Sequence, residues 1–190
     1  MRKVIVSEMV SLDGFFAGMN GEIDWHIVDE EFNQYAIDLL NTVDTILFGR
    51  VTYQLFEGYW PAAALNPSTS KSDIEIAHKI NNNTKIVFSN TLENVRWKNT
   101  MLVKEVIPEE IAKMKQHPGK DLVIYGSGSI VSTFAQLGLI DEYRIIVNPV
   151  VLGSGKPLFK GIKDRINLKL LKTKMFSSGN VLLVYKPAKN

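Results

Sequence analysis

Two glycine-bearing turns are the residues of this sequence best suited to holding a ligand. Gly49-Arg50-Val51-Thr52 directly follows the apolar run 45–48, and Gly126-Ser127-Gly128-Ser129 directly follows the run 122–125. Each run predicts a buried strand, and each turn opens a segment with helical spacing. The first turn of a helix carries free backbone N–H groups that bind phosphate oxygens. The two turns together therefore predict a site that holds a dinucleotide diphosphate from both sides.

The side chains of the first turn fit an anion site, because a guanidinium binds phosphate oxygens through a fixed fork of N–H groups. Arg50 supplies the guanidinium and Thr52 a hydroxyl group. The alternative is structural: Gly49 ends a strand, Arg50 is a solvated charge, and Ser129 caps a helix after a tight connection. The glycine spacing of the Rossmann fingerprint and the Gly-Lys-Ser/Thr phosphate loop are both missing from the sequence, so those nucleotide-binding classes fit poorly.

A second candidate cluster combines an indole ring with carboxylates. Asp24-Trp25 precedes Asp29-Glu30-Glu31 in one short stretch. A carboxyl group beside an apolar wall has a raised pKa and can bind or protonate a heterocycle. The alternative is that Trp25 belongs to the core and that the acids oppose the positive end of a helix dipole. The three histidines share no metal-ligand spacing, and we expect no metal site.

Composition limits the class of protein. The 190 residues are 45% hydrophobic and 22% charged, which is enough to bury one core without disulfides or metal, so we expect one domain over residues 1–190. The net charge of +2 predicts neither a nucleic acid nor an anionic membrane as a partner. The sequence holds no cysteine and no apolar run of membrane-spanning length. A cytoplasmic protein is expected.

The hydrophobic pattern predicts the elements that must position these residues. Strands are expected at residues 4–10, 45–48, 85–88, 101–106, 121–125, 142–147, 168–173 and 181–185. Helices are expected at 29–40, 51–57, 73–80, 108–117 and 130–137, with loops at 15–29 and 59–72. This alternation predicts an α/β fold: a central twisted, mostly parallel mixed sheet of about eight strands, with helices on both faces and an antiparallel C-terminal edge. In such sheets, ligands bind beyond the carboxyl ends of the strands.

Six segments carry a resemblance to known proteins. Three resemble the dihydrofolate reductase superfamily: Ser11-Leu12-Asp13-Gly14-Phe15-Phe16-Ala17-Gly18, Gly21-Glu22-Ile23-Asp24-Trp25 and Asp44-Thr45-Ile46-Leu47-Phe48-Gly49-Arg50-Val51-Thr52-Tyr53. Three resemble more closely the reductase domain of the bifunctional riboflavin-biosynthesis deaminase/reductases: Tyr125-Gly126-Ser127-Gly128-Ser129, Gly138-Leu139-Ile140-Asp141-Glu142 and the stretch 148–159. Together the segments span nearly the whole chain in the order that the family has.

The resemblance implies an NADPH-dependent reductase that transfers hydride to a pteridine- or aminopyrimidine-type heterocycle. By matched position it implies that backbone groups of Val10 and Ala17 bind the nicotinamide carboxamide. The diphosphate would lie between the turn 49–52 and the segment 126–130, whose last residue is Ile130. The adenosine 2′-phosphate would be bound by Arg50 together with Ser89, Asn90 and Thr91. It places Trp25, Glu30 and Tyr125 on the substrate side. Glu30, with Asp29 as the runner-up, is then expected to assist protonation.

The sequence departs from the family where the substrate would bind. Tyr125 stands where riboflavin-type reductase domains have an acid, and Ile23 where they have a polar residue. The folate-binding acid has three candidates in 29–31. A homodimer is implied by analogy and by the need to cover the edge of the sheet. Two other readings stay open: a non-catalytic NADPH-binding sensor or ligand carrier, and an α/β domain whose glycine turns are only structural.

Overall fold

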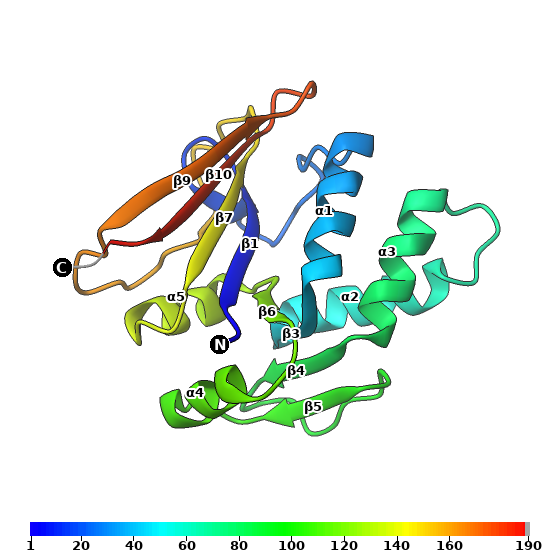
Figure 1. Ribbon diagram of the computed structural model, residues 1–190. Helices are drawn as coiled ribbons and strands as arrows, with labels where there is room; N and C mark the ends of the chain where they lie inside the picture. Colours follow the sequence, from blue (N-terminus) through cyan, green and yellow to red (C-terminus); the bar gives the residue numbers. More distant parts are fainter. Residues whose placement is uncertain (189–190) are drawn as a thin grey trace.

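An eight-stranded sheet in the order β5-β4-β3-β6-β1-β7-β10-β9 runs through the molecule (Figure 1). The computed structural model describes residues 1–188. The strands are β1 (Val4–Val10), β3 (Val43–Gly49), β4 (Thr84–Phe88), β5 (Thr100–Val103), β6 (Asp121–Ile124), β7 (Glu142–Val147), β9 (Leu168–Met175) and β10 (Val181–Pro187). The six strands from β5 to β7 are parallel, whereas β10 is antiparallel to β7 and β9. The predicted mixed sheet with an antiparallel C-terminal edge is confirmed.

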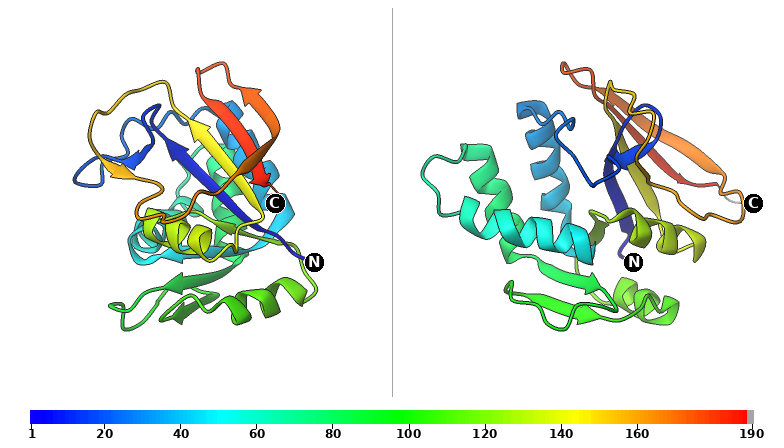
Figure 2. Two further views of the ribbon diagram at one scale, coloured as in Figure 1. Left: turned by 90° about the vertical axis from the view of Figure 1, so that its left-hand side faces the viewer. Right: turned by 180° about the vertical axis from the view of Figure 1, so that it is seen from behind.

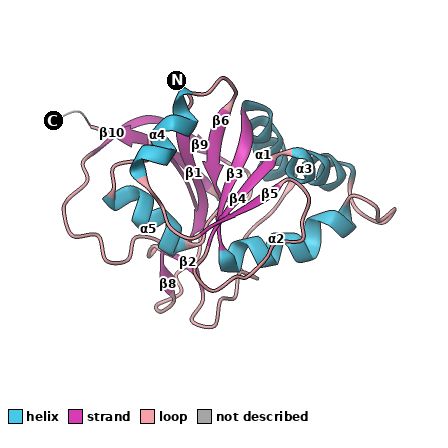
Figure 3. Cartoon of the chain, turned by 90° about the horizontal axis from the view of Figure 1, so that it is seen from below, coloured by secondary structure: helices cyan, strands magenta, loops and turns pink. Residues whose placement is uncertain are grey.

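Five helices cover the two faces of this sheet within the described residues. They are α1 (Glu30–Thr42), α2 (Arg50–Ala63), α3 (Lys71–Asn82), α4 (Pro108–Gln116) and α5 (Gly128–Gln136). The side chains of α1, α2 and α3 share one buried cluster, and those of α4 and α5 share another. Figure 3 shows α1 and α3 on one side of the sheet and α4 and α5 on the other. Within residues 1–188, none of the helices is long and apolar enough to cross a membrane.

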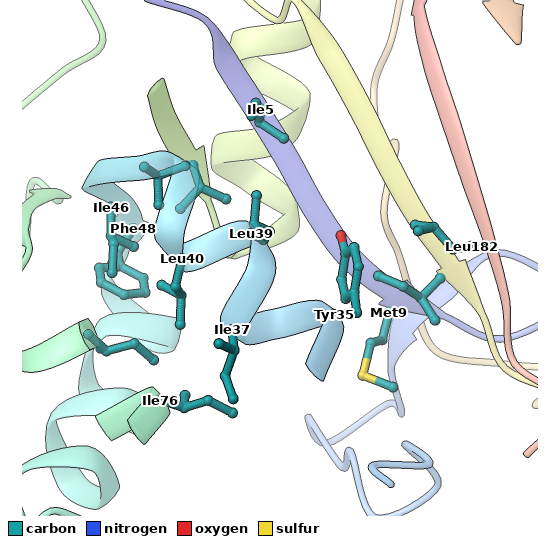
Figure 4. Packing of buried hydrophobic residues seen from close by; sticks show 14 of the residues in the cluster. Ile5, Met9, Tyr35, Ile37, Leu39, Leu40, Ile46, Phe48, Ile76 and Leu182 are labelled. Carbon is teal, nitrogen blue, oxygen red and sulfur yellow. The ribbon is translucent and has the colours of Figure 1, made fainter. Parts of the chain in front are cut away.

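The alternation of side chains along β1 builds both halves of the core. Successive side chains of a strand point to opposite faces of the sheet. Ile5 and Met9 therefore join the cluster on the α1 side, where Figure 4 shows them with Tyr35. Val6 and Val10 join the cluster on the α5 side. Glu8 lies between these two valines and belongs to the same face, so a carboxyl group occupies a position that the strand pattern assigns to an apolar side chain.

Two short strands were not predicted from the pattern: one lies in the expected loop 15–29, and the other lies between the predicted strands 142–147 and 168–173. β2 (Phe15–Ala17) pairs with β8 (Lys156–Pro157) in a separate antiparallel sheet (Figure 2). Strands of two or three residues have no periodic signal, and their pairing joins distant segments. The Asp13 carboxylate fixes this junction by accepting hydrogen bonds from the N–H groups of Leu152 (3.1 Å) and Gly153 (2.7 Å). Hydrogen bonding, first from the Ser11 side chain, lowers the Asp13 pKa.

Helix α2 extends beyond its predicted end into the expected loop 59–72. It includes Pro61 and ends at Ala63, so the ring interrupts only its last turn. Trp60 packs edge-on against Phe56, with ring centroids 6.1 Å apart, and its carbonyl accepts a 3.1 Å hydrogen bond from Asn81 Nδ2. The ring contact within α2 and the tertiary hydrogen bond from α3 hold the segment in a helix. Strand β5 is shorter than predicted, since it ends at residue 103 rather than 106.

Strand β9 forms an edge of the main sheet. Among the described strands its only hydrogen-bonded neighbour is β10, and nearly all of its residues are exposed. The exposed side chains include Leu168, Leu170, Leu171 and Met175. Figure 1 shows β9 (orange) at the outer edge of the sheet, next to β10. The strand also carries Lys169, Lys172 and Lys174, so its edge is mixed in character. An unpaired sheet edge is a surface that proteins cover, pair or protect with charged side chains.

Candidate functional site

A cavity of about 920 Å³ lies at the carboxyl end of the parallel strands. Its floor includes Glu8 and Met9 from β1 and Tyr125, which directly follows β6. Helices α1, α2, α3 and α5 and the β2–β8 sheet supply its walls. This is the location at which open α/β sheets bind their ligands.

The two glycine turns predicted from the sequence meet at this cavity. They follow β3 and β6, which are neighbouring parallel strands, and the Gly49 N–H donates a 2.8 Å hydrogen bond to the Gly126 carbonyl. Helix α2 begins after Gly49 and α5 after Ser127, and neither cap residue accepts a side-chain hydrogen bond from a backbone N–H of its helix. The residues of the two turns that line the cavity are Val51, Thr52, Ser127, Gly128 and Ser129. Two helix N-termini with unsatisfied N–H groups therefore border one space.

Gly126 occupies a position that no other residue type fits well. Its φ is +96°, and its peptide bond to Ser127 is cis. A Cβ atom there would lie 2.7 Å from Glu8 Oε1 and 2.9 Å from Thr52 Oγ1. The turn thus needs glycine both for its backbone conformation and for the close approach of two polar side chains. The helix cap is Ser127 rather than Ser129, whose hydroxyl lies 3.1 Å from that of Ser127.

The four residues expected at the 2′-phosphate lie outside the cavity lining. Gly49 and Phe88 are paired in β3 and β4, so Arg50 and Ser89 follow at the same end of adjacent strands. Arg50 is exposed, and its Nη1 donates a 3.0 Å hydrogen bond to Gln54. The Ser89 hydroxyl accepts from the Thr91 N–H (3.2 Å), and Asn90 is exposed. The structure brings these four residues to one end of the sheet.

The remaining cofactor candidates differ in their surroundings. Ala17 lines the cavity. Val10 is buried, and its carbonyl accepts a 2.7 Å hydrogen bond from the Asn148 N–H. Ile130 is buried in the cluster beneath α5. The side chains of Val10 and Ile130 thus support the cavity from the core without lining it.

Of the two substrate-side candidates with rings, Tyr125 lines the cavity and Trp25 lies outside the described lining. The ring centroid of Tyr125 lies 5.9 Å from that of Phe56, and burial raises the pKa of its phenol. Trp25 donates from Nε1 to the Glu22 carbonyl (3.2 Å) and packs edge-on against His26. His26 lines the cavity, and burial lowers the pKa of its imidazole.

The carboxylates expected to assist protonation face elsewhere. Asp29 caps α1 by accepting a 2.8 Å hydrogen bond from the Phe32 N–H, which lowers its pKa. Glu30 is exposed and accepts a 3.2 Å hydrogen bond from Ser72. Glu31 binds Ser177, which lowers the Glu31 pKa. All three acids lie outside the described lining of the cavity.

The carboxyl group that does line the floor of the cavity is Glu8, which our sequence reasoning missed. Its Oε1 is buried and has no hydrogen-bond partner within residues 1–188. Burial raises its pKa from 4.5 to about 8. Tyr125 is a neighbour of Glu8, and the ionisable groups close enough to affect the Tyr125 pKa are Glu8, Tyr35 and Arg144. The available signal was a lone acid inside an apolar strand, in the sequence Val-Ile-Val-Ser-Glu-Met-Val.

Three further charged residues line the cavity. Asp73 belongs to α3, whereas Lys156 belongs to β8 and Lys160 follows it. Within residues 1–188, no group of three or more His, Asp or Glu side chains is arranged to hold a metal ion. The chemistry available to the site includes hydrogen bonding, anion binding at the helix N-termini and proton transfer.

Comparison with known proteins shows the family to which this chain belongs. The family model of the RibD C-terminal domain matches residues 2–182. An uncharacterized protein, YyaP of Bacillus subtilis (strain 168), is 44% identical over 184 residues, which cover 97% of this chain and 94% of YyaP. A second B. subtilis protein, the uncharacterized YwjB, is 33% identical over 177 residues, which cover 92% of this chain and 92% of YwjB. The resemblance seen in the sequence motifs is confirmed.

Solved structures show the same fold. A putative riboflavin biosynthesis protein from Shewanella sp. PV-4 superposes with a TM-score of 0.75 at 24% identity, covering 98% of this chain and 99% of that one. A deaminase/5-amino-6-(5-phosphoribosylamino)uracil reductase from Thermotoga maritima superposes with a TM-score of 0.67 at 15% identity, and the match covers 98% of this chain and 57% of that one. Dihydrofolate reductase from Enterococcus faecalis, complexed with NADP(H), gives 0.61 at 17% identity, covering 98% and 97%.

Proposed function

Because the chain belongs to the RibD C-terminal domain family, we propose that it is an NADPH-dependent reductase acting on a C=N bond of a pteridine- or aminopyrimidine-type heterocycle. The observation that carries the proposal is the meeting of two uncapped helix N-termini, those of α2 and α5, at one large cavity. A protein named for riboflavin biosynthesis and a dihydrofolate reductase share the fold.

The residues of this chain fit a dinucleotide phosphate. The N–H groups at the start of α2 and α5 would bind the diphosphate, and Gly126 allows the backbone to approach it closely. Arg50 and the segment 89–91 would bind a 2′-phosphate at the ends of β3 and β4. Bound NADPH would supply the hydride. Ala17 and the neighbouring β2–β8 sheet would close the site over the nicotinamide and exclude water.

Hydride transfer to the carbon of a C=N bond leaves the nitrogen in need of a proton. Glu8 is the group that we propose to deliver it. The carboxyl lies next to Gly126 of the second cofactor turn, on whose α-carbon a Cβ atom would meet both Glu8 Oε1 and Thr52 Oγ1. It also lies beside Tyr125, whose ring packs near that of Phe56 of α2. It thus lies where the proposed cofactor turns meet the α1–α2 side of the cavity. The protonated carboxyl would donate to the nitrogen and would recover its proton from water after product release.

Two measurements test the cofactor assignment. NADPH should raise the melting temperature more than NADH does, because only NADPH carries the 2′-phosphate. NADPH oxidation should then be screened against dihydropterins, folates and aminouracils. Binding without any turnover would favour the sensor or ligand carrier. Absence of a thermal shift with either nucleotide would contradict the proposal and leave the turns as structural connections.

The proton donor is tested by a matched pair of isosteric variants, Glu8→Gln and Glu30→Gln, with 6-methyl-7,8-dihydropterin as the hydride acceptor. A general acid contributes roughly 10²–10⁴ in rate, so Glu8→Gln should lose at least the lower figure while Glu30→Gln keeps its activity. NADPH affinity should stay unchanged in both. For the unmodified protein, kcat should fall as the pH rises past about 8, where Glu8 loses its proton. Loss of activity in Glu30→Gln alone would return the role to Glu30.

A further inference from the structure

One part of the cavity is bounded by α1, α2 and α3 and differs in chemistry from the rest. We call it the apolar arm. Its apolar lining comes chiefly from Phe32 and Leu40 of α1, Leu55, Phe56 and Trp60 of α2, and Ile76 of α3. The helices also contribute Asn33, Thr52 and Asp73, and every other residue that they place in the described lining is apolar. The arm therefore offers a wide hydrophobic wall and few hydrogen-bonding groups.

The charges of the cavity are distributed unevenly. Asp73 is the one charged residue that α1, α2 and α3 contribute to the described lining, and it is negative. The two lysines of the lining, Lys156 and Lys160, belong to the segment of β8, and α5 lines the cavity with them. Figure 3 shows α5 and β8 on the side of the sheet opposite α1 and α3. A phosphate or carboxylate placed in the apolar arm would thus lose its water without gaining a cation.

We propose that the apolar arm binds an uncharged, apolar substituent of the substrate, so that the site selects unphosphorylated heterocycles. The proposal rests on the proposed function, which supplies the heterocycle itself. The Thermotoga maritima neighbour is named for a phosphoribosyl-bearing aminouracil. The described lining of the arm provides no cation for such a phosphate. Under this proposal, the present protein acts on an unphosphorylated heterocycle, whereas the Thermotoga maritima protein is named for a phosphorylated one, although the two share a fold.

Calorimetric titration of the full chain with two pterins tests this directly. The probes are 6-methylpterin, which has an apolar substituent, and 6-carboxypterin, which has an anionic one at the same position. Each is titrated with and without saturating NADPH. We expect 6-methylpterin to bind about tenfold more tightly or better. Equal or tighter binding of 6-carboxypterin, or no binding of either probe, would overturn the proposal.

A charge added to the arm provides the reverse experiment. Leu55 lines the cavity and is 52% exposed, so a lysine can replace it without entering the core. Leu55→Lys should tighten 6-carboxypterin binding about tenfold. Met101→Lys adds the same charge on β5 at an equally exposed residue outside the described lining of the cavity, and should leave both affinities unchanged. If Leu55→Lys fails to favour the anionic probe, the selectivity does not come from the arm.

The failures of the two proposals are distinguishable. Pterin selectivity in a protein that binds NADPH but never oxidises it would keep the chemistry of the arm and remove the reductase. NADPH oxidation combined with a preference for the anionic pterin would keep the reductase and remove the arm as its specificity site.

Discussion

Replacing Glu8 with glutamine should make the folded protein more stable at alkaline pH and change its stability little near pH 5. Burial raises the Glu8 pKa from 4.5 to about 8, so the native state holds this proton more tightly than the unfolded state. The resulting contribution to the free energy of unfolding is fully present below about 4.5. It is lost as the pH rises through the folded pKa near 8. A glutamine side chain carries no titrating proton, so the Glu8→Gln variant should lack this pH dependence.

The size of the effect follows from the shift. A difference of about 3.5 pH units at 1.36 kcal/mol per unit sets an upper limit of about 5 kcal/mol. Glu8 Oε1 is enclosed, but part of the residue is open to the cavity, where water lowers the cost of the charge. We therefore expect a difference of roughly 2–4 kcal/mol between the two proteins at about pH 9. The amide adds a constant offset, so the slopes with pH carry the information.

Urea unfolding followed by circular dichroism between about pH 5 and pH 9 measures these slopes. Glu30→Gln is the matched control, because it makes the same change on an exposed residue and should parallel the unmodified protein. His26, whose pKa burial lowers, is unchanged in all three proteins, so we expect its titration to contribute equally to the three profiles. Parallel profiles for Glu8→Gln and the unmodified protein would refute the reasoning, since they would mean that the folded protein hydrates or pairs this carboxylate.

Other predictions concern the cofactor turns and the sheet edge. Arg50→Ala should weaken NADPH binding about 10- to 100-fold and NADH binding much less, as calorimetry can measure, because a charge-assisted contact is worth about 1.5–3 kcal/mol; equal losses would remove Arg50 from this role. Gly126→Val should abolish NADPH binding and lower the melting temperature, because a Cβ there meets Glu8 and Thr52; unchanged affinity would contradict a role for this turn. Light scattering should show a homodimer, which Leu170→Glu on the exposed edge should convert to a particle near 21.4 kDa; a particle of that mass before mutation would rule the dimer out.

The sequence was sufficient for the strands of the sheet because their pattern is local. The predicted strands 4–10 and 142–147 coincide with β1 and β7. In β1 only Ser7 and Glu8 interrupt the apolar residues, as is typical of a parallel strand that is buried on both faces. The contact between Gly49 and Gly126 required more. It depends on β3 and β6 being neighbours, and strand order is decided by how the whole chain packs. The motif residues were therefore identifiable, while their meeting at one cavity became visible only in the fold.

The carboxyl group that lines the cavity could not be predicted from the sequence pattern. Asp29, Glu30 and Glu31 attracted attention because acids gather at helix N-termini, and Asp29 does cap α1. That local role uses the carboxylate on the backbone and turns it away from the cavity. Glu8 gave only an interruption in an apolar strand. Glu8 lies next to Gly126, which is far along the chain, so no local pattern reports the burial that raises its pKa.

The apolar arm depends on the least predictable segment of all. Pro61 favours the end of the helix when only local propensity is considered. Asn81 of α3 instead binds the Trp60 carbonyl, and Phe56 packs on the indole, so α2 continues to Ala63. Without that last turn the arm would lose Trp60 from its wall. The specificity that we propose thus depends on a helix extension that is fixed by tertiary contacts with α3. Under the proposed function, a relative that keeps the glycine turns but lacks this extension would bind the same cofactor and differ in substrate.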